Sequence, residues 1–310
     1  VMTRLSHGHL RIGSFQRPYF LQEEDNLRAL IRYACETYAP AIYAKAYGSE
    51  NGGGDAEAAP LLLRWASRNC ARTVADWFAA GFVHGVLNTD NINITGESFD
   101  YGPYRFLPKM NPNFVAAYFD ERGLYAFGRQ PEAVYWNLQQ FAGVLALVAE
   151  HEAIVDGLKA YSDCLAEAIE DRLFRRLGLR SSGDIATDQA FLQNLLATLK
   201  ETGVPLDDVL HRAFCGREWP AEDEWAEVRA LARDFQSDRP ERLDHPYFAQ
   251  SGATTLVIED IEGLWAPIAE KDDWSLFSDK LQQTETMRQA YDLQIEVADD
   301  GSWALSAVQA

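Results

Sequence analysis

The sequence predicts an α+β fold that is mostly α, with one small β-hairpin inserted among the helices. Apolar residues recur at helical spacing along most of the chain, whereas residues 82–107 interrupt this pattern with a short alternating strand and turn signals. A hydrophobic content of 47% beside 24% charged residues is typical of a chain that buries a core, which argues against general disorder. The 310 residues allow two domains or one large one.

The helices are predicted from apolar spacing and end signals. Asp25 can cap a helix in which Leu27, Leu30 and Ile31 share one face. Residues 48–60, rich in glycine and acidic residues, predict a loop, and a long helix is expected over 61–80. Further helices are expected over 132–155, 157–178, 188–202, 205–215, 221–235, 257–269 and 274–292, and a terminal hairpin over 295–297 and 303–305.

The chain is strongly acidic. It has 28 Lys and Arg residues against 47 Asp and Glu, a net charge of −19. This charge disfavours binding to nucleic acid or to an anionic membrane, although a small basic pocket for one phosphate-bearing ligand is still allowed. No stretch approaches the roughly 18–20 apolar residues that span a bilayer. Four cysteines without a CxxC pair are typical of reduced thiols, so we expect a cytoplasmic protein.

The hairpin insert carries the candidate chemistry. A turn near Thr95 and Gly96 pairs residues whose numbers sum to about 190 or 191, which places Asp90 and Asn91 beside Asp100. Two carboxylates and an amide oxygen are ligands that suit Mg²⁺ or Mn²⁺, and crowded carboxylates repel one another unless a cation lies between them. The alternative is a polar turn whose side chains bond only to nearby backbone groups.

Residue order adds a second indication. Kinases place a histidine, then a catalytic aspartate two residues later, then a metal-binding asparagine, and a metal-binding aspartate after a short hairpin. His84, Asn91 and Asp100 follow this order, but Val86 stands where the catalytic aspartate is expected and cannot accept a proton. An acid occurs instead at Asp90. The order therefore predicts nucleotide and metal binding and disfavours ordinary phosphorylation.

Three longer segments closely resemble the selenoprotein O (SelO, or YdiU) family: HGVLNTDN at 84–91, FDYGPYRFL at 99–107 and QPEAVYWNLQQFA at 130–142. The resemblance covers about residues 1–215 and is weak beyond them. It implies a protein-kinase-like C-terminal lobe core over 1–215, with a helical extension of the same domain over 216–310. It also implies ATP bound in a reversed orientation, and transfer of AMP, or of UMP in some members, to protein hydroxyl groups with Mg²⁺ or Mn²⁺.

The resemblance also assigns roles to individual residues. Asp90 would accept the proton of the incoming Ser, Thr or Tyr hydroxyl, and Asn91 and Asp100 would bind the metal, with Asp100 also close to the nucleotide. Arg4 and Arg11 match arginines that contact the ATP phosphates, a task that suits the guanidinium group. Without the resemblance, these two arginines would be interpreted as part of a solvated strand face.

Other polar and aromatic residues of the motifs have supporting roles in this interpretation. We expect His84 to support the loop as a packed, hydrogen-bonded residue, with Asn137 buttressing the site from below and Trp136 packing in the core. The expected partners are proteins with hydroxyl side chains, and neither nucleic acid nor a membrane.

The chain also departs from the family pattern. The first lysine is Lys45, inside the helical region, so the family's N-terminal lobe with its glycine-rich loop and nucleotide-anchoring lysine is expected to be absent. The isolated chain is therefore expected to bind ATP weakly and to have little or no transferase activity. The family's redox-active residue near the C-terminus is missing, since the last cysteine is Cys215. Two alternatives stay open: an inactive pseudokinase-like binding module, and a small-molecule kinase with a displaced base.

Overall fold

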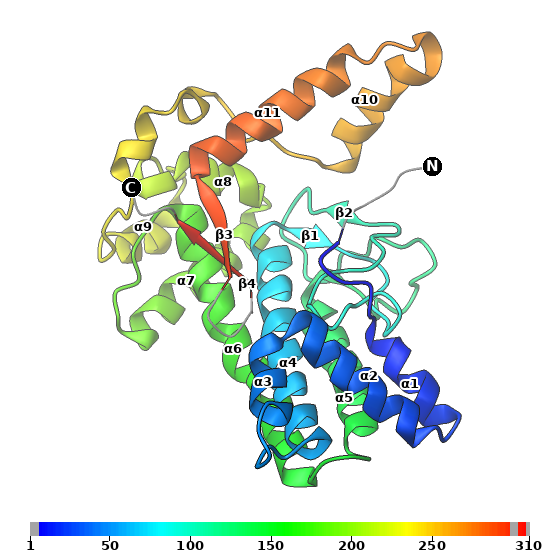
Figure 1. The fold of residues 1–310 in the computed structure, drawn as a ribbon. Coiled ribbons are helices and arrows are strands. Elements are labelled where there is room, and N and C mark those ends of the chain that lie inside the picture. The colour runs from blue at the N-terminus through cyan, green and yellow to red at the C-terminus, as the bar shows by residue number, and fades with distance from the viewer. Residues whose placement is uncertain (1–5, 298–302, 308–310) are drawn as a thin grey trace.

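The computed structural model describes residues 6–297 and 303–307, and the fold is mostly helical (Figure 1). The helices are α1 Ile12–Phe20, α2 Glu24–Tyr38, α3 Pro40–Tyr47, α4 Asp55–Ala79, α5 Gln130–Leu145, α6 His151–Leu177, α7 Ile185–Thr202, α8 Leu206–Arg212, α9 Ala226–Ala232, α10 Ile258–Lys271 and α11 Ser275–Tyr291. The strands are β1 Phe82–Val83, β2 Arg105–Phe106, β3 Leu293–Val297 and β4 Trp303–Ala307. Short 3₁₀ turns cover Phe127–Arg129, Phe214–Gly216, Asp223–Trp225, Pro240–Asp244 and Pro246–Ala249.

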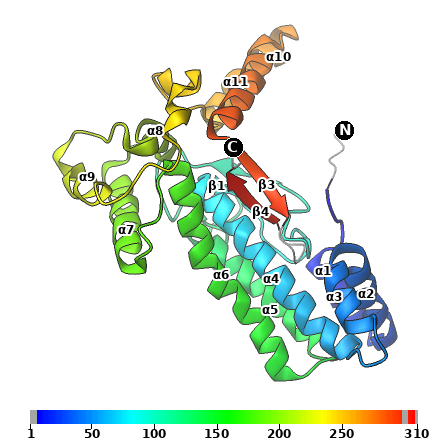
Figure 2. The same ribbon diagram turned by 60° about the vertical axis from the view of Figure 1, so that its left-hand side comes forward.

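The long helices α4 and α6 lie side by side and, with α5, form the body of the molecule (Figure 2). Their close approach depends on Gly157 of α6, where an added Cβ would lie 2.8 Å from the Pro60 carbonyl oxygen of α4. Helices α1, α2 and α3 cover the end of this group that points downward in Figure 1. There Phe15 of α1 packs on Phe141 of α5, with 4.8 Å between the ring centroids.

The second half of the chain packs in two further groups of buried side chains. Phe191 of α7 lies between two other rings. Its centroid is 4.7 Å from that of Phe235 and 6.0 Å from that of Phe174, which belongs to α6. Phe214 stacks on Phe248 at 4.3 Å, next to Tyr291 at the end of α11. Helices α10 and α11 then project from the body as a pair (Figure 1). No helix in the described part of the chain is both long and apolar enough to cross a membrane.

Most predicted helices are present, but the region before residue 61 differs from the prediction. Residues 55–60, predicted as loop, form the first turns of α4, and α1 and α3 were not predicted. Three of the six residues from Asp55 to Pro60 are alanine and one is glutamate, all strong helix formers, and this local propensity outweighs the glycine run that ends at Gly54. The predicted terminal hairpin is confirmed, since β3 pairs antiparallel with β4.

The close contact at Gly157 predicts a measurable loss of stability. Gly157→Ala forces α6 away from the Pro60 carbonyl, so the free energy of unfolding should fall by about 1–3 kcal/mol. Gly143→Ala is the matched control, because Gly143 is a helical residue of α5 with no atom within 4 Å of an added Cβ. The control should be neutral or more stable by up to about 1 kcal/mol in urea unfolding. Equal stability of the two variants would contradict the proposed packing.

Candidate active site

The hairpin insert has the predicted register. Ile92 bridges Ser98, the Phe99 N–H donates to the Asn91 carbonyl at 2.8 Å, and the Asn93 N–H donates to the Glu97 carbonyl at 2.9 Å. Each of these pairs sums to 190, so the turn falls at residues 94–96, as the sequence indicated. Asp90 directly precedes Asn91, in a turn closed by the Asn91 N–H donating to the Asn88 carbonyl at 3.0 Å, and Asp100 directly follows Phe99, so both lie at the open end of the hairpin.

The segment before α1 adds a third extended strand to this hairpin. The Ile94 N–H donates to the Leu10 carbonyl and the Ile12 N–H donates to the Ile92 carbonyl, both at 2.9 Å. This pairing brings Arg11 to the open end, where its guanidinium lies over the Phe99 ring at 4.6 Å. Its Nη1 atom is 4.0 Å from the Asp90 carboxylate. Arg4, the other arginine predicted to contact the ATP phosphates, lies outside the described residues.

The side chains of Asn91 and Asp100 have defined orientations. The Asn91 Nδ2 atom donates to the Val86 carbonyl at 3.0 Å, so the amide oxygen is the atom that is left to bind a cation. One carboxylate oxygen of Asp100 accepts from the Gly102 N–H at 3.2 Å. Asp90 and Asp100 are both exposed, whereas Asn91 is half-buried. The open end of the hairpin therefore presents oxygen ligands toward solvent.

His84 and Ser98 form a buried hydrogen-bonded unit beneath these residues. The Ser98 hydroxyl is 2.8 Å from the Asp100 carbonyl and 3.2 Å from the Asn91 carbonyl. The His84 Nδ1 accepts from the Val86 N–H at 3.3 Å, so the proton of the neutral ring lies on Nε2, which donates to Ser98 Oγ at 2.6 Å. His84 thus ties both strands together, which agrees with the expected supporting role.

The electrostatic state of His84 fits this role. Its side chain is fully buried, and burial lowers its pKa to about 4. The ring is therefore neutral at pH 7, and both nitrogens are occupied by structural hydrogen bonds. His84 is a support for the site and not a proton acceptor in it.

Helix α5 supports the loop from the other side. The Asn137 Nδ2 atom donates to the Leu87 carbonyl at 3.0 Å, and the Gln130 side chain bonds to the backbone of Phe82 and His84 at 2.9 Å each. The expectation that Trp136 packs in the core was wrong, since this side chain is 51% exposed. Neighbouring helical residues point about 100° apart, so when Asn137 faces the loop Trp136 faces solvent.

Ser98 and Gly13 were not among the predicted site residues. Ser98 is buried on the inward side of the second hairpin strand, where alternation alone predicts an apolar residue. A polar residue at such a position is the signal that could have identified it. Gly13 follows the end of the third strand, and its N–H donates to the Thr89 carbonyl at 2.8 Å. No local pattern indicates this contact, because it joins segments 76 residues apart.

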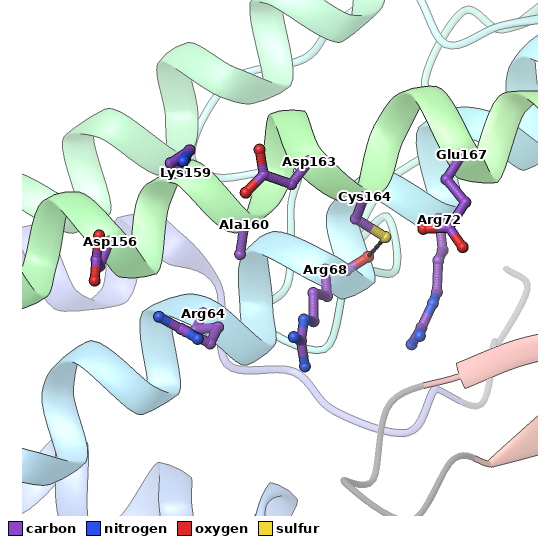
Figure 3. A pocket seen from close by; sticks show the side chains of 9 residues that line it. All are labelled: Arg64, Arg68, Arg72, Asp156, Lys159, Ala160, Asp163, Cys164 and Glu167. Carbon is purple, nitrogen blue, oxygen red and sulfur yellow. Dashed lines mark hydrogen bonds between the residues drawn. The ribbon is translucent and has the colours of Figure 1, made fainter. Parts of the chain in front are cut away.

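A separate cavity lies between α4 and α6 (Figure 3). It has a volume of about 470 Å³, and its lining residues are Arg64, Arg68, Arg72, Asp156, Lys159, Ala160, Asp163, Cys164 and Glu167. The four cationic side chains face three carboxylates, so the charges of the wall nearly cancel. None of the predicted site residues lines it. The cavity is therefore distinct from the hairpin site and lacks the excess positive charge that a phosphate pocket requires.

Comparisons with known proteins identify the family of this chain. The model of a family described as protein adenylyltransferase SelO matches residues 1–228. A protein nucleotidyltransferase YdiU of Synechocystis sp. is 32% identical over 311 residues, which covers 92% of this chain and 63% of the relative. The YdiU protein of Trichodesmium erythraeum is 31% identical over 300 residues, with 91% and 63% covered. That of Gloeobacter violaceus is 32% identical over 301 residues, with 90% and 59% covered.

The names of these relatives indicate one class, the protein nucleotidyltransferases. The chain belongs to the SelO family, and the resemblance inferred from the three segments is confirmed. It spans 63% of the length of the Synechocystis and Trichodesmium relatives.

The lowered pKa of His84 predicts a pH-dependent stability. The histidine of the unfolded chain takes up a proton below about pH 6.5, whereas the folded protein does so only near pH 4. Stability is thus full above pH 6.5 and falls as the pH drops toward 4, by about 2 kcal/mol between pH 7 and pH 5 for this group. His84→Gln should lose this part of the pH dependence in urea unfolding.

The control for this experiment is His151→Gln, at the exposed first residue of α6. The control should keep the pH dependence of the parent chain. A His84→Gln variant whose stability falls as steeply as that of the parent would show that His84 is not held neutral by burial.

Proposed function

We propose that the chain carries the catalytic lobe of a protein adenylyltransferase, which transfers AMP from ATP to hydroxyl groups of proteins. The hairpin register carries the proposal, because it brings Asp90, Asn91 and Asp100 to one open end together with Arg11. Membership of the SelO family supports the same chemistry. Residues 1–215 would then form a protein-kinase-like lobe core, and residues 216–310 a helical extension of the same domain.

The donors at the open end fit Mg²⁺ or Mn²⁺. Asn91 offers an amide oxygen and Asp100 a carboxylate oxygen, and hard cations of this kind prefer such oxygen ligands. Among the residues that the structure describes, no three His, Cys, Asp or Glu side chains are grouped so as to hold a metal ion. This fits a cation that takes only two ligands from the protein and the others from water and phosphate. When bound, the cation would offset negative charge on the phosphates.

The protein's own residues account for the remaining needs of the reaction. The bond between the α-phosphorus and the oxygen leading to the β-phosphate breaks, a bond to the substrate hydroxyl oxygen forms, and pyrophosphate leaves. Asp90 takes the hydroxyl proton, and Arg11, whose guanidinium lies 4.6 Å from the centre of the Phe99 ring, binds phosphate oxygens beside it. Arg4 is proposed for the same task. The Arg11–Asp90 contact is long and exposed, so it leaves the guanidinium free to bind phosphate.

The kinase alternative is disfavoured by the contacts of Val86. The Val86 carbonyl accepts from Asn91 and its N–H donates to His84, so this residue serves as a backbone anchor. Its side chain has no group that could accept a proton. In this arrangement the acid suited to proton transfer is Asp90, one residue before the proposed metal ligand.

Labelled ATP tests the reaction. Although little transferase activity is expected of the isolated chain, we expect Mn²⁺ and long incubation to give a low but measurable incorporation of α-³²P label into protein, and no γ-label. Asp90→Asn should lower the rate by about 100-fold or more, because it removes the proton acceptor. Asp279→Asn, an exposed carboxylate on α11, should keep the parent rate. The Synechocystis relative serves as the positive control, and γ-label on protein or an unchanged Asp90→Asn rate would contradict the proposal.

Metal binding is tested separately from turnover. With a non-hydrolysable ATP analogue present, Asn91→Ala and Asp100→Ala should each weaken Mn²⁺ binding by about tenfold or more, measured by electron paramagnetic resonance of free Mn²⁺. Asp279→Asn should bind as the parent chain does. If neither Asn91→Ala nor Asp100→Ala changes the affinity, these two residues are not the metal ligands.

A further inference from the structure

The first turn of α1 holds the loop that carries Asp90. The Gly13 N–H donates to the Thr89 carbonyl at 2.8 Å, and the Thr89 hydroxyl donates to Gln16 Oε1, also at 2.8 Å. The residue before Asp90 is thus fixed to α1 through both its backbone and its side chain. Helix α1 in turn packs on α5 through Phe15 and Phe141, which joins this attachment to the body of the molecule.

The Asp90 carboxylate lies in the space that a side chain at position 13 would fill. A Cβ added to Gly13 would lie 2.4 Å from Asp90 Oδ1 and 3.3 Å from Asp90 Cγ. Real Cβ atoms do not approach an oxygen this closely. The backbone of Gly13 is helical, and it is not among the glycines with positive φ. The position therefore requires glycine for the space it leaves and not for its backbone freedom.

The carboxylate is also attracted to this place. The start of a helix carries partial positive charge, and Arg11, the residue before α1, holds Nη1 at 4.0 Å from Asp90 Oδ1. The free space and this weak contact favour one position for a side chain that is otherwise 67% exposed.

We infer that Gly13 is a positioning residue for Asp90, and that the missing side chain lets the proton acceptor lie against the first turn of α1. This inference rests on the proposed role of Asp90 in AMP transfer. Any larger residue displaces the carboxylate first, because it is the flexible end of a side chain. The next nearest backbone atom, the Thr89 carbonyl oxygen, is 3.3 Å away and requires only a small adjustment.

The test is Gly13→Ala, with Gly143→Ala as the matched control in open space on α5. A crystal structure of Gly13→Ala should show the backbone ladder unchanged and the Asp90 carboxylate moved away from α1. The α-label transfer rate at saturating ATP should fall by about tenfold or more, while the KM for ATP stays within about twofold. Mn²⁺ binding should match the parent chain, because Asn91 and Asp100 are untouched.

The outcomes separate this inference from the proposed function. If Asp90→Asn transfers AMP at the parent rate, the proposed function fails, whatever Gly13→Ala does. If Asp90→Asn is inactive and Gly13→Ala is as active as the parent, the function stands and the positioning role is overturned. A carboxylate that keeps its place in the Gly13→Ala structure overturns that role as well, even if no transfer is measured.

A second variant covers the case in which Gly13→Ala does not fold. The double variant Gly13→Ala/Asp90→Ala removes the carboxylate that the new methyl group meets. It should fold with the stability of Asp90→Ala alone, which supports the contact. Failure of the double variant to fold would show that the added methyl group clashes elsewhere, and would overturn the inference.

Discussion

Ser98 lies on the second hairpin strand, two residues before Asp100, and its hydroxyl reaches the backbone carbonyls of both Asn91 and Asp100. The hydroxyl is in turn fixed by His84, which is fully buried and neutral. A buried imidazole with both nitrogens occupied keeps one orientation, since any rotation would leave a polar atom unpaired. The separation of Asn91 from Asp100 is therefore set below the surface, while their oxygen atoms are left at the open end of the hairpin.

The turn of the hairpin is fixed against the long helix α4. Gly96 has a φ of +89°, and an added Cβ would lie 2.7 Å from the Asn69 carbonyl carbon. Glycine is required at this turn both for its backbone conformation and for the close approach. One end of the hairpin thus rests on α4, and its other end is bonded to α1 through Gly13 and Thr89. Two helices from different parts of the sequence hold the site between them.

The parts of this arrangement that could be predicted are local in sequence. Alternation and a glycine turn were enough to predict the register of the hairpin, in which Asn91 pairs with Phe99, because the two strands are joined by a short turn. The contact between Gly13 and Asp90 could not be predicted, since it depends on where α1 packs. The start of α4 was misjudged because its glycine-rich approach masked a run of helix formers. Trp136 was misjudged because one apolar residue does not show which face of a helix is covered.

Because the chain is strongly acidic, nucleotide binding at the hairpin depends on the positively charged groups there. With a net charge of −19, the protein as a whole repels ATP, and the open end of the hairpin adds the carboxylates of Asp90 and Asp100. Arg11 is the described cation that the backbone ladder brings to this end. One guanidinium does not balance two carboxylates and a triphosphate, so nucleotide binding here needs further positive charge. A divalent cation held by Asn91 and Asp100, as proposed above, would supply that charge at the point where the repulsion is strongest.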